Sequence, residues 1–171
     1  MASHPAVDVV EASRAHRDLL VRLLQLYLHD LSAVESWDVD DTGSFGEGDL
    51  DGCWVDERRH PFVILADDHV AGFAIVDEGS EVSGETDVFD MAEFFVLRRW
   101  RRRGVGRQAV GQLTVRFPGR WEVRPFPGYQ AGEQFWRRVC WEVSEGEPQI
   151  GTFERGGTVF PMYSFTAPSV G

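Results

Sequence analysis

Residues 94–110 read FFVLRRWRRRGVGRQAV, and this stretch decides how the rest of the chain is interpreted. An apolar run is followed by five arginines, then by Gly104 and Gly106, and then by a segment of helical pattern. The first N–H groups of a helix lack intrahelical partners and carry partial positive charge, and glycine lets a ligand approach the backbone closely. A strand that leads through such a loop into a helix is therefore typical of an anion site.

Guanidinium groups in this segment could add forked contacts to phosphate oxygens. We therefore interpret the segment as a pyrophosphate cradle, with a solvated arginine cluster before an ordinary helix as the alternative. Gly104–Ala109 also matches the dinucleotide pattern G-x-G-x-x-A. That pattern belongs in a tight turn directly after a strand, usually in the first βαβ unit. Here an arginine-rich connection intervenes in mid-chain, which disfavours a dinucleotide fold.

Composition bounds the class of protein. The 171 residues, 43% of them hydrophobic, predict one domain spanning residues 1–171 with a sizeable core. The net charge of -11 argues against a nucleic-acid partner, which needs a broad basic surface. With no long apolar run and no secretory signal, we predict a cytoplasmic protein without membrane association. Cys53 and Cys140 are predicted to be free thiols, and the scattered histidines predict no metal site.

Periodicity in the first half predicts a strand, a helix, a loop and a hairpin. Val7–Ala12 reads as a strand, and Ser13 could cap the helix that follows. Apolar side chains at helical spacing extend that helix to Val34, at Leu20, Leu23, Leu24, Tyr27, Leu31 and Val34. An acidic, glycine-rich loop follows, and then two β-prone runs, Phe62–Ala66 and Val70–Val76. We expect Asp67–His69 to join these runs as a hairpin connection.

The second half alternates strands and helices. We predict a strand in residues 87–99 and a helix over Val105–Val115 that Pro118 and Gly119 end. The remaining predicted elements are a strand (120–126), a short helix (132–139) and two strands (140–145 and 158–165). The order β-α-loop-β-β-β-α-β-α-β-β predicts a mixed α/β fold around one central sheet.

The glycine loop carries a family resemblance. Arg101-x-x-Gly104-x-Gly106 resembles the (Q/R)-x-x-G-x-(G/A) signature of GNAT-family N-acetyltransferases. Residues 92–106 are similar to that family's fourth strand and pyrophosphate loop, with Val96 at the hydrophobic position before the loop. Residues 133–139, EQFWRRV, resemble the later helix in which an aromatic pair lies near the thioester. The order of elements agrees from Val7 to Phe165.

This resemblance implies a mixed, mostly antiparallel central sheet flanked by helices, with a splayed pair of strands that receives acetyl-CoA as co-substrate. The pantetheine amides are expected to pair with the backbone of Phe95, Val96 and Leu97. The cofactor's pyrophosphate is expected to lie on the loop and helix start that follow, made of Arg101, Arg102, Arg103, Gly104, Val105, Gly106 and Arg107. No metal is implied.

The resemblance also implies direct transfer of the acetyl group to an amine, with no covalent enzyme intermediate. A carboxylate can accept the amine proton, often through water. Glu93 is the candidate, because it lies three residues before Val96 and interrupts the apolar run MAEFFVL. The alternatives for Glu93 are an exposed sheet edge or an ion pair with one of the arginines.

The proton for the leaving thiolate has no obvious donor. Many family members use a tyrosine in the later helix, where this chain has Phe135 and Trp136. An indole N–H is not a useful acid. Tyr129 lies seven residues before Trp136, on the same helical face but about two turns away, and Tyr163 is in a late strand. Departure without assistance, departure through water, and reduced or lost activity all stay open.

Acidic residues crowd the loop of residues 35–51, which borders the acceptor site in the resembling enzymes. They could attract a cationic amine or belong to a solvated loop. Trp37, Phe45 and Trp54 could form an apolar wall or anchor the loop. We expect a small amine as substrate and a monomer or homodimer. The alternatives are a non-catalytic acyl-CoA-binding module and a peptide N-acetyltransferase.

Overall fold

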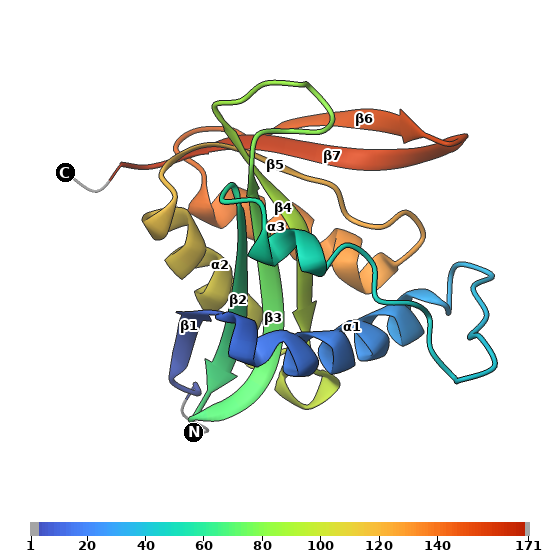
Figure 1. Cartoon of the computed structure of the whole chain (residues 1–171). Coiled ribbons are helices and arrows are strands. Elements are labelled where there is room, and N and C mark those ends of the chain that lie inside the picture. The colour runs from blue at the N-terminus through green and yellow to red at the C-terminus, as the bar shows by residue number, and fades with distance from the viewer. Residues whose placement is uncertain (1–3, 170–171) are drawn as a thin grey trace. The chain divides into compact units, whose positions relative to one another are not determined.

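The computed structural model describes residues 4–169, and its elements follow the predicted order. Figure 1 shows ten main elements: β1 (Val7–Glu11), α1 (Arg17–Leu31), β2 (Arg59–Ala66), β3 (His69–Glu78), β4 (Val88–Val96), α2 (Val105–Arg116), β5 (Gly119–Val123), α3 (Gln130–Val143), β6 (Gln149–Arg155) and β7 (Thr158–Ala167). Short 3₁₀ turns add η1 (Arg14–His16), η2 (Asp51–Trp54) and η3 (Arg98–Trp100).

Hydrogen bonds join the strands in the order β1-β2-β3-β4-β5-β7-β6. The predicted mixed sheet with flanking helices is thereby confirmed. The chain divides into two compact units, and β3 and β4 run through both. The first unit holds the chain up to Ile75 together with Glu93–Val105, and the second holds Val76–Ala92 together with the chain from Gly106. Within residues 4–169, no helix has both the length and the apolar character needed to cross a bilayer.

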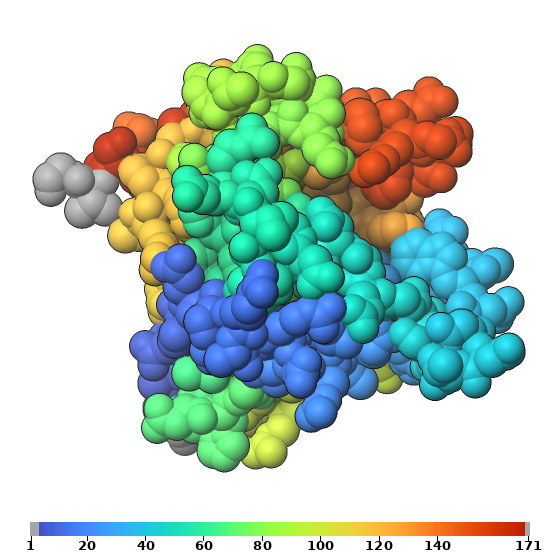
Figure 2. Space-filling model, viewed as in Figure 1, coloured from blue at the N-terminus to red at the C-terminus, as the bar shows by residue number. Residues whose placement is uncertain are grey.

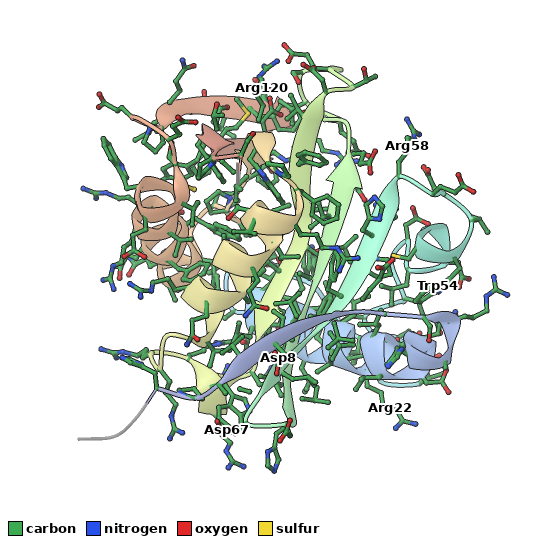
Figure 3. All side chains as sticks on the ribbon, turned by 90° about the vertical axis from the view of Figure 1, so that its left-hand side faces the viewer. Asp8, Arg22, Trp54, Arg58, Asp67 and Arg120 are labelled. Carbon is green, nitrogen blue, oxygen red and sulfur yellow. The ribbon has the colours of Figure 1, made fainter. Side chains whose placement is uncertain are left out.

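In the first unit, α1 is amphipathic as predicted. Leu20, Leu23 and Leu24 are at most 4% exposed, whereas Arg22 on the other side of the helix points outward in Figure 3. The Tyr27 ring packs against those of Phe73 and Phe95, with centroids 6.2 and 5.5 Å apart. The helix therefore rests on the aromatic side chains of β3 and β4.

Helix α1 is shorter than its apolar pattern predicts. It ends at Leu31, and Val34 lies in the following turn, 40% exposed. The Ser32 hydroxyl donates to the carbonyl oxygen of His29 at 2.8 Å. A serine that bonds to its own local backbone offers the chain an alternative to continuing the helix. The prediction that the helix includes Val34 was therefore wrong.

The hairpin of β2 and β3 turns on two residues rather than three. Asp67 and Asp68 have φ of +48° and +61°, and His69 already belongs to β3. Two left-handed residues make the two-residue turn that suits the twist of paired strands, and aspartate tolerates that conformation. Asp67 at the tip also accepts the backbone N–H of Ala6 at 3.0 Å (Figure 3).

In the second unit, β5 lies between a parallel and an antiparallel neighbour. It pairs in parallel with Val88–Asp90 of β4 and in antiparallel with β7 along its whole length. Trp121 of β5 stacks on Phe165 of β7, with centroids 6.2 Å apart and planes 5° from parallel. The parallel pair β4–β5 fits the splayed cofactor-binding strands expected from the resemblance.

Helix α3 is longer than predicted and contains most of the segment expected to be a strand. Trp136, Val139 and Cys140 share one buried face at i, i+3 and i+4, and the helix continues to Val143. The prediction of a strand over residues 140–145 was therefore wrong. The strand that does lie between α3 and β7 is β6. It forms a hairpin with β7 through Gly156 and Gly157, both at positive φ (Figure 1).

Candidate functional site

The end of β4 stays hydrogen-bonded to β3. The N–H of Leu97 donates to the carbonyl oxygen of Ala71 on β3 at 2.8 Å. The backbone N–H of Leu97, the first residue after β4, is thereby bound to β3. Of the three residues predicted to pair with pantetheine, Leu97 therefore has its N–H bound within the sheet.

Gly72 allows β3 and β4 to approach closely at this point. A Cβ on Gly72 would collide with the carbonyl oxygen of Phe95 and would lie 3.1 Å from the Cα of Val96. Glycine in a strand commonly marks such a close backbone approach. The predicted cofactor-binding end of β4 can thus lie this close to β3 because Gly72 has no Cβ.

The predicted phosphate loop is anchored by Trp100 and curved by two left-handed residues. Trp100 is 5% exposed, and the guanidinium carbons of Arg99 and Arg103 lie 5.0 and 5.8 Å from its ring centroid. Arg102 and Gly104 have φ of +61° and +82°. A non-glycine residue in this region is uncommon and often marks a functional turn. The exposed side chains of Arg102 and Arg103 leave the loop strongly positive.

Asp30 binds two of the arginines that precede the glycines. Asp30 lies at the C-terminal end of α1 and is 5% exposed. Arg98 donates to Oδ1 through Nε at 3.0 Å and Nη2 at 2.6 Å, and Arg101 donates to Oδ2 through Nη2. Burial raises the pKa of Asp30, but the hydrogen bonds from Arg101 and Arg98 outweigh it, so its pKa lies below the ordinary value.

The Arg101 side chain makes a further contact within the first unit. Besides Asp30, its guanidinium donates through Nε to the carbonyl oxygen of Val96 at 2.6 Å. Gly106 and Arg107 follow in the first turn of α2, in the second unit. The Arg107 guanidinium there lies 3.7 Å from Glu142, an exposed and therefore weak ion pair.

Glu93, the candidate base, lies on β4 in the first unit and is half-buried. It occupies the same strand as Phe95 and Val96, as the sequence predicted. The strand thus carries the candidate base and the predicted pantetheine-pairing backbone within five residues, Glu93 to Leu97.

A buried charge cluster in the second unit lies where the β4–β5 pairing ends. Asp90 and Glu122 are register partners at the last paired position, 2% and 5% exposed. Arg124 binds Asp90 at 2.6 Å, and the Ser80 hydroxyl donates to Glu122. Burial raises the pKa of Asp90 to about 6, against the opposing effect of Arg124. The cluster fastens the two strands together at their point of divergence.

The aromatic pair of α3 is present, and neither nearby tyrosine lies on that helix. The rings of Phe135 and Trp136 are 5.0 Å apart in a T-shaped arrangement, and Trp136 is buried. Tyr129 is the residue before α3. Tyr163 on β7 is 7% exposed, and its pKa is raised, first by burial and then by Cys140 of α3.

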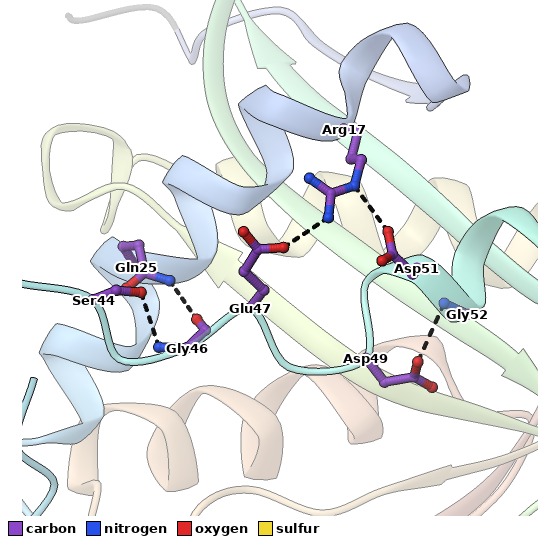
Figure 4. Close-up of polar contacts among 8 residues, drawn as sticks. All are labelled: Arg17, Gln25, Ser44, Gly46, Glu47, Asp49, Asp51 and Gly52. Atoms are coloured by element: carbon purple, nitrogen blue, oxygen red, sulfur yellow. Dashed lines mark hydrogen bonds and ion pairs between the residues drawn. The ribbon is translucent and has the colours of Figure 1, made fainter. Parts of the chain in front are cut away.

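Carboxylates of the acidic loop after α1 bind α1 and the loop's own backbone. Arg17 binds Glu47 at 2.7 Å and Asp51 at 2.8 Å (Figure 4). Asp40 accepts the backbone N–H groups of Thr42 and Ser44, at 2.8 and 3.0 Å. The loop lies on the surface (cyan in Figure 2), so these contacts hold the loop in place while staying exposed to solvent.

The loop's aromatic side chains take different positions. Trp37 is 39% exposed, and the Phe45 ring packs edge-on against His29 with centroids 6.5 Å apart. Trp54 of η2 is half-buried (Figure 3). Phe45 therefore acts as an anchor of the loop, whereas Trp37 offers a surface to solvent.

Sequence reasoning missed Asp30 and Gly72. A carboxylate at a helix C-terminus opposes the helix dipole, so Asp30 at the end of the predicted helix carried a usable signal of a compensating cation. Gly72 in a β-prone run likewise signals a close approach. Neither signal names the partner, which in both cases lies in residues 95–101.

The comparisons with known proteins agree with this geometry. The model of the acetyltransferase (GNAT) family matches residues 20–150. The chain belongs to the GNAT acetyltransferase family. As a GNAT protein it shares its fold with solved structures of low sequence identity, and a search of curated proteins finds no significant match.

Three of these solved structures show the extent of the fold. An acetyltransferase from Thermus thermophilus has a TM-score of 0.68 and 16% identity, over 96% of this chain and 99% of that one. RimL, a ribosomal L7/L12 alpha-N-protein acetyltransferase in complex with coenzyme A, has a TM-score of 0.63 and 13% identity, over 96% of each chain. The PaiA N-acetyltransferase of Thermoplasma acidophilum, also in complex with coenzyme A, has a TM-score of 0.63 and 10% identity, over 94% of this chain and 99% of that one.

Proposed function

We propose that this GNAT protein transfers the acetyl group of acetyl-CoA to a primary amine of a small, cationic molecule. The observation that carries the proposal is the continuous passage from the end of β4 through a curved, arginine-rich loop into the start of α2. Acetyl-CoA supplies the activated thioester. The family model runs across both compact units, which supports treating residues 1–171 as one acetyltransferase domain.

The residues of the loop fit a polyanionic co-substrate. The left-handed conformations of Arg102 and Gly104 turn the backbone just before the first N–H groups of α2. Helix N-termini bind phosphate through such N–H groups and through the helix dipole. The exposed arginines supply further charge to this segment. We propose that the backbone of Val96 binds the pantetheine arm, since a carbonyl oxygen has two lone pairs and can accept a second donor beside Arg101.

Glu93 is the proposed proton acceptor for the attacking amine. Amine attack requires the neutral form, and a positioned carboxylate can remove the proton directly or through one water. An acidic protein of net charge -11 favours encounter with a cationic amine. RimL, which shares the fold, is by its name a protein acetyltransferase, so a protein N-terminus is the alternative acceptor.

The test combines binding with turnover. Calorimetry is expected to show acetyl-CoA binding, and a panel of amino acids, polyamines, aminoglycoside-like compounds and peptides is expected to show CoA release with a small cationic amine. Glu93→Gln is expected to lower kcat by about 100-fold or more while leaving acetyl-CoA binding intact. Glu57→Gln, an exposed glutamate in the same unit, is the matched control.

Each failure has its own meaning. Absence of acetyl-CoA binding at millimolar concentration would contradict the co-substrate assignment. Binding without CoA release for any amine, with no effect of Glu93→Gln, would indicate a non-catalytic acyl-CoA-binding module. Release with peptides alone would move the acceptor to a protein N-terminus.

A further inference from the structure

Asp30 is an unfavourable residue for its position unless it has a role. A carboxylate at the C-terminal end of α1 opposes the helix dipole, and its residue is only 5% exposed. Replacing a buried ion pair by apolar side chains is often neutral or stabilising, so folding alone does not require this charge. We therefore consider which groups the Asp30 carboxylate holds in place.

Asp30 holds both ends of the turn that starts the phosphate loop. Arg98 is the first residue of η3 and Arg101 is the residue that follows it, and each binds a different oxygen of the carboxylate. Arg101 in turn donates to the carbonyl oxygen of Val96 at 2.6 Å, and its guanidinium carbon lies 5.4 Å from the centroid of the Phe95 ring. One carboxylate thus fixes the turn, and through Arg101 it fixes the end of β4.

We propose that Asp30 is a positioning residue for acetyl-CoA binding, which acts through Arg101 on the Val96 carbonyl and on the loop that follows. This rests on the proposed function. Asp30 binds the side chains of both Arg98 and Arg101, so those two arginines shape the loop. The phosphates are left to the exposed Arg102 and Arg103 and to the backbone N–H groups. The sequence motif therefore begins with an arginine whose side chain is used for structure.

The test uses Asp30→Asn, which removes the charge and keeps the shape, beside Asp18→Asn, an exposed aspartate on the same helix. Asp30→Asn is expected to raise the KM for acetyl-CoA about tenfold while kcat at saturating acetyl-CoA changes less than about twofold, because binding geometry is lost and the base is untouched. Amide hydrogen exchange in residues 97–104 is expected to accelerate in Asp30→Asn without cofactor. Asp18→Asn is expected to match the wild type in both measurements.

A double-mutant cycle separates positioning from general destabilisation. If Asp30 acts through Arg101, the effects of Asp30→Asn and Arg101→Gln on the KM are non-additive, and the double variant resembles Arg101→Gln alone. Additive effects, or an unchanged KM and exchange rate in Asp30→Asn, would overturn the proposal. A wild type that binds no acetyl-CoA would contradict the proposed function instead, and the exchange measurement would still decide whether Asp30 orders the loop.

A second variant guards against misfolding. Arg98→Gln removes only the more exposed half of the contact, since the Arg98 side chain is 73% exposed. It is expected to fold normally and to raise the KM about threefold, less than Asp30→Asn. No change in Arg98→Gln together with an unfolded Asp30→Asn would assign Asp30 to stability alone and overturn the proposal.

Discussion

Asp90 shows how one buried carboxylate couples the β4–β5 pair to pH. It is 2% exposed, binds Arg124 at 2.6 Å and has Glu122 as its register partner. Removal from water is the largest effect on its pKa and outweighs the attraction of Arg124. A group whose pKa is higher in the folded state than in the unfolded state binds its proton more tightly when folded.

The consequence is a loss of stability as the pH rises. The contribution of Asp90 is fully present below its ordinary pKa of 3.8 and is lost as the pH passes through about 6. The free energy of unfolding is expected to fall by up to about 3 kcal/mol from this group between those values. Urea denaturation of the wild type and of Asp90→Asn from pH 4 to 7 measures it, and the wild type minus variant difference is expected to decrease with pH.

The matched control is Asp87→Asn, whose side chain is 76% exposed just before β4. It is expected to preserve the pH dependence of the wild type. A difference between wild type and Asp90→Asn that stays constant across this range would show that Asp90 titrates as an ordinary carboxyl.

At the scale of elements, the contact of β3 with β4 rests on Gly72. Gly72→Ala is expected to push the Phe95–Val96 backbone away from β3, because the new Cβ would collide with the Phe95 carbonyl oxygen. The expected loss in the free energy of unfolding is about 1–3 kcal/mol, together with a raised KM for acetyl-CoA. Urea denaturation and steady-state kinetics measure the two effects.

Gly111→Ala in α2 is the opposite control. No atom lies within 4 Å of a Cβ built there, beyond the neighbouring residues and the helix's own backbone. Alanine in a helix interior is expected to stabilise the protein by about 0.5–1 kcal/mol relative to glycine. If Gly72→Ala left the free energy of unfolding unchanged, β3 and β4 would have room for a Cβ that the structure does not show.

Elements with a clear period were predictable, and those without one were not. Helix α1 and the β2–β3 hairpin follow from their apolar spacing, because each buries one face. The segment from Cys140 was predicted as a strand because its residues are β-prone, but it extends the buried face of α3. β6 is almost entirely exposed and so lacks an apolar pattern, although Gly156-Gly157 carried the turn signal of its hairpin.

The same distinction holds for the candidate site. The phosphate loop was predictable, because its glycines and arginines are adjacent in sequence and their backbone demands are local. The pairing of Asp30 with Arg98 and Arg101 spans about seventy residues and depends on how α1 packs against β4. Contacts of that range arise from the fold, so the sequence alone did not predict that the Arg101 side chain binds Asp30.

At the scale of the whole molecule, the net charge of -11 contrasts with the arginine-rich loop. A cationic acceptor is attracted by the summed field, and salt screens that field over about 10 Å at 0.1 M. Raising the ionic strength from about 0.02 to about 0.3 M is therefore expected to lower kcat/KM for a cationic amine several-fold. A neutral amine of similar size, measured at saturating acetyl-CoA, is the comparison.

The comparison isolates the acceptor's charge, because both amines share one co-substrate. An equal response of the two amines to salt would remove long-range attraction from the account of acceptor choice. It would leave selection to local contacts such as those offered by the exposed Trp37.

The position of β5 in the sheet also sets the order in which the protein becomes complete during synthesis. β5 is bonded to β4 over three residues and to β7 over five, and β7 is the last strand described. A ribosome releases β4, α2 and β5 well before β7, so the nascent chain first holds β5 by its short pairing with β4 and by the contact of Arg124 with Asp90. The strand pair expected to receive acetyl-CoA is therefore paired on both sides only when Thr158–Ala167 of β7 have left the exit tunnel.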